Sequence, residues 1–342
     1  MELPKPRGPL SATLVDALAG PPRTLLPVAD SSGDPLADED LQLALHIGYE
    51  LHYRGFDGVD DEWEWHPSRL AVHQAAERQF EAALRELVPM PDPVAAADVP
   101  RALTAVMEAD DAPSVSKYLM GRATLEQFRE FVMHRSIYHQ READPHTWAI
   151  PRLGGRAKAA LVEVQADEYG GGRVDRMHAE LFRTTMRELG LDATYGAYLD
   201  RAPAITLAIN NLMSLFGLNR RLLGAILGHL AIYEMTSSLP NRRYGNGLRR
   251  LGLGPDATRF YDEHVEADAV HEQIAAHDLC GTYCAEAGPE QSSLVLFGAA
   301  AALALDARFA GHLLDRWAAG GSSLRAQSST ANGRLLAGAL GA

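Results

Sequence analysis

The sequence predicts an all-α protein in which a large helical domain follows an N-terminal helical extension. Long segments repeat their apolar residues at the three- and four-residue spacing of a helix face. No segment shows the alternation and hairpin turns of paired β-strands, and no internal repeat is visible. A chain of 342 residues is also long enough to bury a helical core without disulfide support.

Composition separates both ends of the chain from the rest. Residues 1–38 are rich in proline and glycine, which is typical of an extended or partly ordered arm. Within this arm, residues 11–18 have the pattern of a short helix. Residues 321–342 consist largely of glycine, serine and alanine, so we expect a flexible tail there.

The helical extension is predicted over residues 39–110. Asp38 or Asp40 can cap a first helix, which ends near Gly55. A second helix over 68–87 is amphipathic, and the prolines that follow it stop it. We expect these two helices to form a pair that is docked on the main body of the protein.

The acidic and aromatic residues of this extension allow two interpretations. They could form a second site, or they could anchor the helical pair by packing, as Trp and His in a short hairpin often do. We favour packing. The residues concerned are Glu50, His52, Glu62, Trp63, Glu64 and Trp65.

The main helical domain is predicted over residues 111–320. Pro240 is expected to end the helix before it, because a proline inside a helix removes a backbone hydrogen bond. The glycine run at 170–172 offers a place where the chain can kink or bulge. The expected helices cover residues 114–120, 124–142, 155–169, 173–189, 204–216, 221–238, 260–280 and 294–317.

The stretch YDEHVEADAVHEQIAAH contains the clearest functional pattern. His264, Asp268 and His271 stand at i, i+4 and i+7, so on a helix their side chains fall within an arc of roughly 60°. A carboxylate between two imidazoles is the ligand chemistry of non-haem iron, for which zinc and manganese compete. The short pattern also fits a polar helix face on which titratable residues align by chance.

Glu234 is a carboxylate on an apolar helix face. Leu227, Leu230 and Ala231 precede it on the same face. Burying a lone carboxylate is unfavourable unless a cation or hydrogen bonds offset the loss of water, so a metal ion would account for Glu234. A protonated or arginine-paired structural glutamate is the alternative.

Glu168 and His178 have similar apolar neighbours on either side of the glycine run. In a straight helix ten residues would separate them by about 15 Å, too far for a compact centre of two metal ions. A kink or bulge at 170–172 would shorten that gap. For each residue taken alone, a structural role explains the sequence equally well.

Together these segments resemble the haem-oxygenase-like diiron oxidases, often called iron-containing redox enzymes. The resemblance covers about residues 119–278 and is carried by EVQADEYGGGRVDRMHAELF, by the helix of Glu234 and by the HVEADAVH segment. It implies a haem-oxygenase-like helical bundle with two iron ions that react with dioxygen. The metal ligands that it implies are Glu168, His178, Glu234, His264, Asp268 and His271.

Glu142, in YHQREADPHTW, falls where nitrogen-oxygenating members of this family have an additional carboxylate on the metals. The resemblance therefore implies Glu142 as a further metal ligand and favours the nitrogen-oxygenating branch. From the local sequence alone, a surface position near a helix end fits Glu142 as well.

The resemblance implies a dioxygen-dependent oxygenase that acts on a small amine-bearing metabolite. Two Fe(II) ions can jointly give two electrons to dioxygen and yield a diferric peroxide. N-oxygenation is favoured over oxidative C–C cleavage, and an external electron donor is compatible with both. Two alternatives stay open: a metal-free enzyme on the same scaffold, and a non-catalytic interaction protein whose His and Glu faces lie on the surface.

An arginine-rich segment follows the helix of Glu234 in this otherwise acidic chain. We single out Arg242 and Arg243, because an arginine near the mouth of a cavity could clamp a substrate carboxylate with two hydrogen bonds. Tyr233 could donate a hydrogen bond near the metals. Pairing of the arginines with surface acids is the alternative.

Composition restricts the partners. A net charge of −13 and a pI near 5.4 argue against a nucleic-acid surface, which needs a basic face. The two cysteines form a lone CxxxC pair, so the reducing cytoplasm is the expected compartment. The N-terminus lacks the apolar core of a signal peptide, and the apolar run at 294–305 is shorter than the roughly 20 residues of a membrane span. We expect a cytoplasmic protein without membrane partners, and a homodimer is compatible with the sequence.

Overall fold

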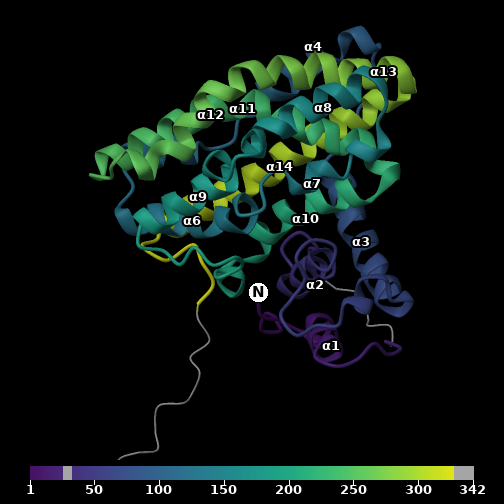
Figure 1. Ribbon diagram of the computed structural model, residues 1–342, viewed down its shortest axis with the longest axis vertical. Helices are drawn as coiled ribbons and strands as arrows, with labels where there is room; N and C mark the ends of the chain where they lie inside the picture. Colours follow the sequence, from purple (N-terminus) through teal and green to yellow (C-terminus); the bar gives the residue numbers. More distant parts are fainter. Residues whose placement is uncertain (26–32, 327–342) are drawn as a thin grey trace, which may run out of the picture.

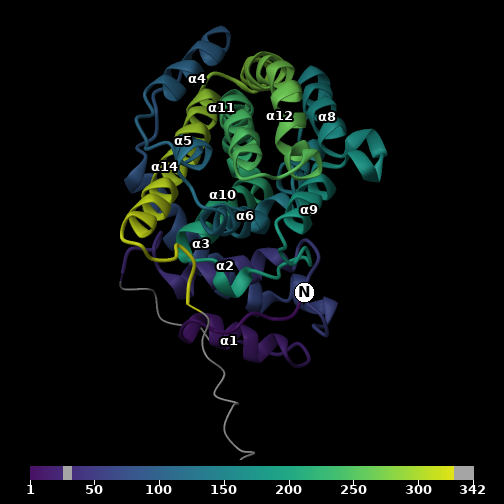
Figure 2. The same ribbon diagram turned by 90° about the vertical axis from the view of Figure 1, so that its left-hand side faces the viewer.

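The structure is a computed structural model that describes residues 1–25 and 33–326, without the side chains of residues 266–270. Every regular element in these ranges is a helix, so the predicted all-α class is confirmed. Figures 1 and 2 show long helices in one bundle, with α1 (Pro9–Leu18), α2 (Glu39–Glu50) and α3 (Pro67–Leu87) gathered at one end of it.

The bundle is built around α11 (Leu223–Arg250), which packs along α12 (Pro255–Gln273) and α14 (Glu290–Ala318). Two glycines allow α11 and α14 to approach closely. A Cβ atom at Gly228 would lie 1.8 Å from the Val295 carbonyl oxygen, and one at Gly298 would lie 2.0 Å from that of Ala225. The other α-helices of the bundle are α4 (Val99–Glu108), α5 (Val115–Gly121), α6 (Leu125–His139), α7 (Asp144–Thr147), α8 (Gly155–Glu168), α9 (His178–Glu188), α10 (Ala204–Leu218) and α13 (Thr282–Ala287).

Two helices are long and apolar enough to cross a membrane when only length and composition are considered. They span Arg220–Arg250 and Glu290–Ala318, so they contain α11 and α14. In their most apolar windows 67% and 56% of the residues are buried inside the bundle. Core helices of a helical bundle meet the same criteria, so this finding alone gives little support to a membrane span.

The expectation that Pro240 ends a helix is wrong. α11 continues through Pro240 for another ten residues, to Arg250. A proline inside a helix is unfavourable by about 3 kcal/mol, but α11 is packed on both sides of it. Gly228 lies against α14 before the proline, and Gly247 lies against Leu119 of α5 after it. Tertiary packing therefore outweighs the local preference.

α12 does not continue as the uninterrupted α-helix that was expected to residue 280. It passes into a π-helical segment, Ile274–Gly281, which buries Leu279 and Cys280. Such segments are rare in helices and are frequent near functional sites. The change of winding begins three residues after His271, at the end of the α-helix that carries both candidate histidines.

The arm before residue 39 contains a docked helix. Asp38 caps α2 by accepting hydrogen bonds from the backbone N–H groups of Asp40 and Leu41. Asp40 serves α1 instead, because its carboxylate accepts from the backbone N–H groups of Leu10 and Ser11. The start of α1 is therefore fixed by a residue of the next helix.

The extension shares its core with the bundle. Trp63 is fully buried, and its apolar cluster includes Leu14 of α1 and Leu207 of α10. Trp65 is 65% exposed and lies against His52, so only the first of these two tryptophans anchors the helices by burial. The sequence also missed α4, which packs on α14 and the π-helical segment.

Candidate metal centre

Buried carboxylates and imidazoles form two adjacent clusters inside the bundle. In the first, ligand atoms of Glu142, Glu168, His178 and His264 lie within 4.8 Å of one another. In the second, the same holds for Glu168, Glu234 and His271. Six of the seven side chains predicted as metal ligands are thus brought together, and Glu168 belongs to both clusters.

Asp268 as a metal ligand stays a prediction. Its backbone lies on α12 between His264 and His271, but its side chain is outside the described residues.

Two imidazole nitrogens face carboxylate oxygens without hydrogen bonding to them. His178 Nδ1 lies 3.0 Å from Glu168 Oε2, and His271 Nδ1 lies 3.4 Å from Glu234 Oε2. Both nitrogens are buried without a hydrogen-bond partner among the described residues. Buried polar atoms rarely stay unpaired. A nitrogen and an oxygen that face each other in this way can both coordinate one cation, so the residues present suit a metal ion.

The outer nitrogens of two histidines make hydrogen bonds that fix their orientation. His271 Nε2 lies 3.0 Å from Asp167 Oδ2, which leaves Nδ1 facing the cluster. His264 Nδ1 lies 2.7 Å from the Phe260 carbonyl oxygen, which leaves Nε2 facing Glu142. Partners of this kind are typical of metal-binding histidines, because they set the tautomer and the ring angle.

The glycine run explains how Glu168 and His178 meet. α8 ends at Glu168, and α9 begins at His178, not at residue 173 as expected. Gly170, Gly171 and Gly172 all have φ near +60 to +80°, so a loop separates α8 from α9 in place of a kink within one helix. A Cβ atom at Gly170 would lie 2.6 Å from the backbone of Arg176 and Met177. The turn requires glycine there.

Glu142 lies in a tight turn between α6 and α7. The next residue, Ala143, has a φ of +72°. Among the described residues it is the only non-glycine residue with a positive φ. His139 Nδ1 lies 2.8 Å from Glu142 Oε1. His139 was not among the residues predicted from the sequence, although its position three residues before Glu142, at the end of a helix, could have indicated it.

Charge in the clusters is balanced between acids and imidazoles. Burial alone would raise the pKa of Glu142, but the imidazoles of His139 and His264 hold that pKa well below its usual range. Burial also opposes ionisation of Glu168, yet His178 lowers the pKa of this carboxyl. The pKa of His271 is raised to about 9, because Glu234 and Asp167 outweigh burial. The clusters therefore hold carboxylates that attract positive charge.

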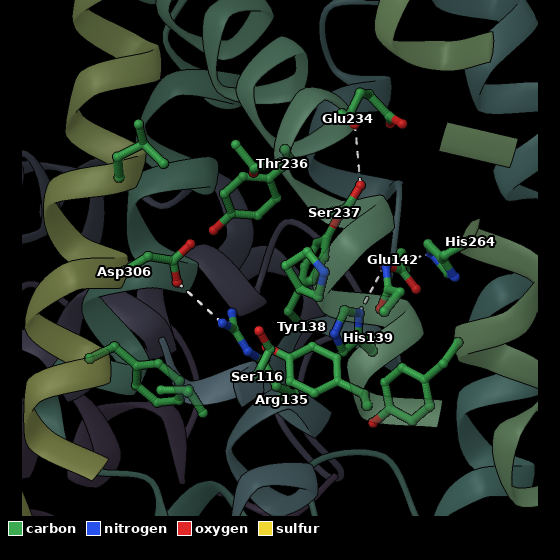
Figure 3. A pocket seen from close by; sticks show the side chains of 18 of the residues that line it. Ser116, Arg135, Tyr138, His139, Glu142, Glu234, Thr236, Ser237, His264 and Asp306 are labelled. Atoms are coloured by element: carbon green, nitrogen blue, oxygen red, sulfur yellow. Dashed lines mark hydrogen bonds and ion pairs between the residues drawn. The ribbon is translucent and has the colours of Figure 1, made fainter. Parts of the chain in front are cut away.

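A cavity of about 360 Å³ extends from these ligands. Figure 3 shows Glu142 and His264 on one side of it and the pair of Arg135 and Asp306 on the other. Arg135 Nη2 lies 3.2 Å from Asp306 Oδ1, and the guanidinium lies over the ring of Phe309. The aromatic residues that line the cavity are Phe131, Tyr138, Tyr233, Tyr244, Phe260, Tyr261 and Phe309.

The predicted substrate arginines are not part of this cavity lining. Arg242 is exposed, and Arg243 donates a hydrogen bond to Ser116. Tyr233 lines the cavity, and its predicted hydrogen bond near the metals stays a prediction. The arginine that lines the cavity is Arg135. Asp306 was also missed, although a lone carboxylate in the apolar sequence of α14 is the same signal that pointed to Glu234.

Comparisons with known proteins agree with this centre. A family model described as "iron-containing redox enzyme" matches residues 129–307, just over half of the chain. All the side chains of the two clusters fall within that range. The nitrosourea synthase of Streptomyces achromogenes subsp. streptozoticus is 29% identical over 168 residues, which are 48% of this chain and 35% of that protein. The matched segment therefore spans about a third of that relative.

Proposed function

Since the chain belongs to the iron-containing redox enzyme family, we propose that its two clusters bind two iron ions and that it uses dioxygen to oxidise an amine-type nitrogen of a small substrate. The observation that carries the proposal is Glu168, a buried carboxylate shared by two sets of imidazole and carboxylate ligands. One such carboxylate can bridge two metal ions. Imidazole and carboxylate ligands suit iron, and the family selects iron over zinc and manganese.

The described side chains divide into metal ligands and substrate-handling groups. Glu142, Glu168, His178 and His264 would hold one iron, and Glu168, Glu234 and His271 would hold the other, with Asp268 as a further ligand. Bound ferrous ions supply the electrons that reduce dioxygen, and an external donor would restore them. The aromatic residues give the cavity a largely apolar wall and leave space for a small metabolite.

Two observations favour nitrogen as the atom that is oxidised. The curated relative is a nitrosourea synthase, so its name points to nitrogen chemistry. In this chain Glu142 is buried within the first cluster, at the position that the family resemblance associated with an additional carboxylate and N-oxygenation. Oxidative C–C cleavage is the competing reaction.

One alternative from the sequence is wrong. A surface interaction protein would expose these His and Glu faces, but Glu142, Glu168, His178, Glu234, His264 and His271 are all buried. The metal-free enzyme predicts activity in the presence of a chelator, so the same preparation can be assayed with and without one.

The test is an anaerobic Fe(II) titration followed by rapid mixing with oxygenated buffer. We expect two iron ions per chain and an oxygen-dependent change in visible absorption. Glu168→Ala should lose tight binding of both ions, because this carboxylate belongs to both clusters. Glu163→Ala is the matched control, because Glu163 is an exposed carboxylate on the same helix.

Substrates can then be screened with the loaded wild-type protein. We expect oxygen-dependent conversion of an amine to a product heavier by one oxygen atom, detected by mass spectrometry. Binding of one iron or none by the wild-type chain would contradict the two-iron proposal. Equal iron binding by wild type and Glu168→Ala would show that Glu168 is not a ligand of either ion.

A further inference from the structure

A buried ion pair joins the N-terminal extension to the turn that carries Glu142. Arg141 Nη1 donates to Glu50 Oε2 at 2.9 Å, and both side chains are 1% exposed. The Tyr195 hydroxyl lies 2.9 and 3.0 Å from the two oxygens of Glu50. The guanidinium also lies over the ring of Tyr53, 4.3 Å from its centroid. Glu50 and Tyr53 come from α2 and the turn after it, in the extension.

The turn itself needs outside support. Arg141 directly precedes Glu142, and Ala143 has a left-handed backbone that costs of order 1 kcal/mol in a non-glycine residue. Gln165 Nε2 donates to the Ala143 carbonyl oxygen at 2.8 Å, and Gln140 Nε2 donates to that of Ala193 at 2.9 Å. Hydrogen bonds from several elements thus hold residues 140–143 in one conformation.

Stability alone does not explain the pair. Removing two charges from water is unfavourable, so a buried ion pair often adds little to folding compared with apolar residues of similar size. The Nε and Nη2 atoms of Arg141 make no hydrogen bond within the described part of the chain. The hydrogen bond to Glu50 and the contact with the Tyr53 ring instead fix the position of Arg141, and with it that of the next residue.

We infer that Glu50 and Arg141 are positioning residues that hold Glu142 in the first cluster, so the extension is part of the scaffold of the metal centre. Arg141 falls within the residues matched by the family model, whereas Glu50 lies outside them. The inference rests on the proposed function for the binding of metal ions by the two clusters.

The test measures metal binding by the full chain, with Co(II) as a spectroscopic probe and Fe(II) under anaerobic conditions. Glu50→Gln should weaken binding of one of the two metal ions by roughly 10- to 100-fold and change its Co(II) absorption bands, while the other ion binds as in wild type. Glu142→Gln should cause a similar loss. The double variant should show no further loss, because both substitutions act on one ligand.

Glu81→Gln is the matched control. Glu81 is a buried carboxylate of the extension that also pairs with an arginine of the bundle, because Arg221 Nη1 donates to it at 2.8 Å. This pair does not adjoin Glu142, so the control should bind both ions normally. Circular dichroism melting shows whether each variant is folded. If Glu50→Gln does not fold, Tyr195→Phe weakens the same link and should give a smaller loss at the same ion.

The outcomes separate the inference from the proposed function. A wild-type chain that binds fewer than two ions contradicts the two-iron proposal itself. A wild-type chain that binds two ions, together with folded Glu50→Gln or Tyr195→Phe proteins of unchanged affinity and spectrum, overturns the positioning role. Equal losses in Glu81→Gln and Glu50→Gln would also overturn it, because the effect would then be general to the extension.

Discussion

The orientation of His271 depends on a residue outside the two clusters. Asp167 precedes Glu168 on α8 and reaches His271 Nε2 at 3.0 Å, while its own side chain is 64% exposed. A carboxylate in this position favours the tautomer whose Nδ1 can bind a metal, and it makes the imidazole a stronger donor. Two neighbouring residues of one helix thus act on the same centre in different ways.

This arrangement predicts that Asp167→Ala weakens metal binding without removing a ligand. We expect roughly 10-fold weaker binding of one ion, at the lower end of the usual range because Asp167 is exposed. The measurement is the Co(II) or Fe(II) titration, with Glu163→Ala on the same helix as control. Wild-type affinity in Asp167→Ala, or an equal loss in the control, would show that the hydrogen bond does not matter for binding.

Glu234 and Asp306 show what can be predicted about single residues. Both are carboxylates on apolar helices, and that pattern is visible in the sequence. Their partners are not: Glu234 faces His271, whereas Asp306 pairs with Arg135 of α6. The partner depends on which helices pack together. For the same reason the sequence pointed to Arg242 and Arg243, and the cavity arginine is Arg135.

At the scale of elements, the turn between α8 and α9 brings two candidate ligands of the metal centre together. Glu168 is the last residue of one helix and His178 the first of the next, and their side chains approach to 3.0 Å. The glycine run could be predicted to interrupt a helix, but not to form a loop that closes on itself, because that closure depends on contacts with residues 174–177.

Gly170→Ala is expected to disturb this turn more than Gly171→Ala. Both residues have a positive φ, which should cost about 1 kcal/mol of unfolding free energy for alanine. Only at Gly170 would the new Cβ meet backbone atoms, at 2.6 Å, whereas nothing lies within 4 Å at Gly171. We therefore expect a further loss of about 1–3 kcal/mol and weaker Fe(II) binding in Gly170→Ala.

Urea unfolding and Fe(II) titration of the two variants provide the measurement. Because the backbone penalty is common to both, their difference isolates the steric contact. Equal stability and equal iron binding in Gly170→Ala and Gly171→Ala would mean that the turn tolerates a side chain at residue 170.

Helix ends show where tertiary packing outweighs the local preferences of capping residues and proline. The cap of α2 could be narrowed to Asp38 or Asp40 from the sequence, since capping depends on neighbouring residues, and the structure assigns it to Asp38. The passage of α11 through Pro240 could not, because it depends on glycine contacts with α14 and α5 on either side of the proline. The π-helical segment after α12 likewise gives no clear sequence signal.

At the scale of the whole molecule, the extension and the bundle are one folded unit. Ile137 of α6 and Leu207 of α10 share an apolar cluster with residues of α1 and α2. Asn211 of α10 donates to the carbonyl and the side chain of Gln42 in α2. Unfolding of the extension should therefore be coupled to unfolding of the domain that carries the metal centre.

His73 of α3 makes this unit sensitive to acid. Burial, followed by the nearby Arg69 and His52, lowers the pKa of His73 from 6.5 to about 3. The native state then binds this proton less readily than the unfolded state does. The contribution of His73 to stability is complete above pH 6.5 and is lost progressively as the pH falls towards 3.

The wild-type protein should therefore lose about 2 kcal/mol more unfolding free energy between pH 7 and pH 5 than His73→Leu loses. The variant cannot take up this proton, while every other histidine is common to both proteins. Urea unfolding at several pH values, followed by circular dichroism, gives both curves. His73→Leu starts from a lower stability if leucine packs poorly against Tyr49, so the slopes are compared and not the absolute values. Parallel curves would mean that His73 takes up its proton equally well in the folded protein.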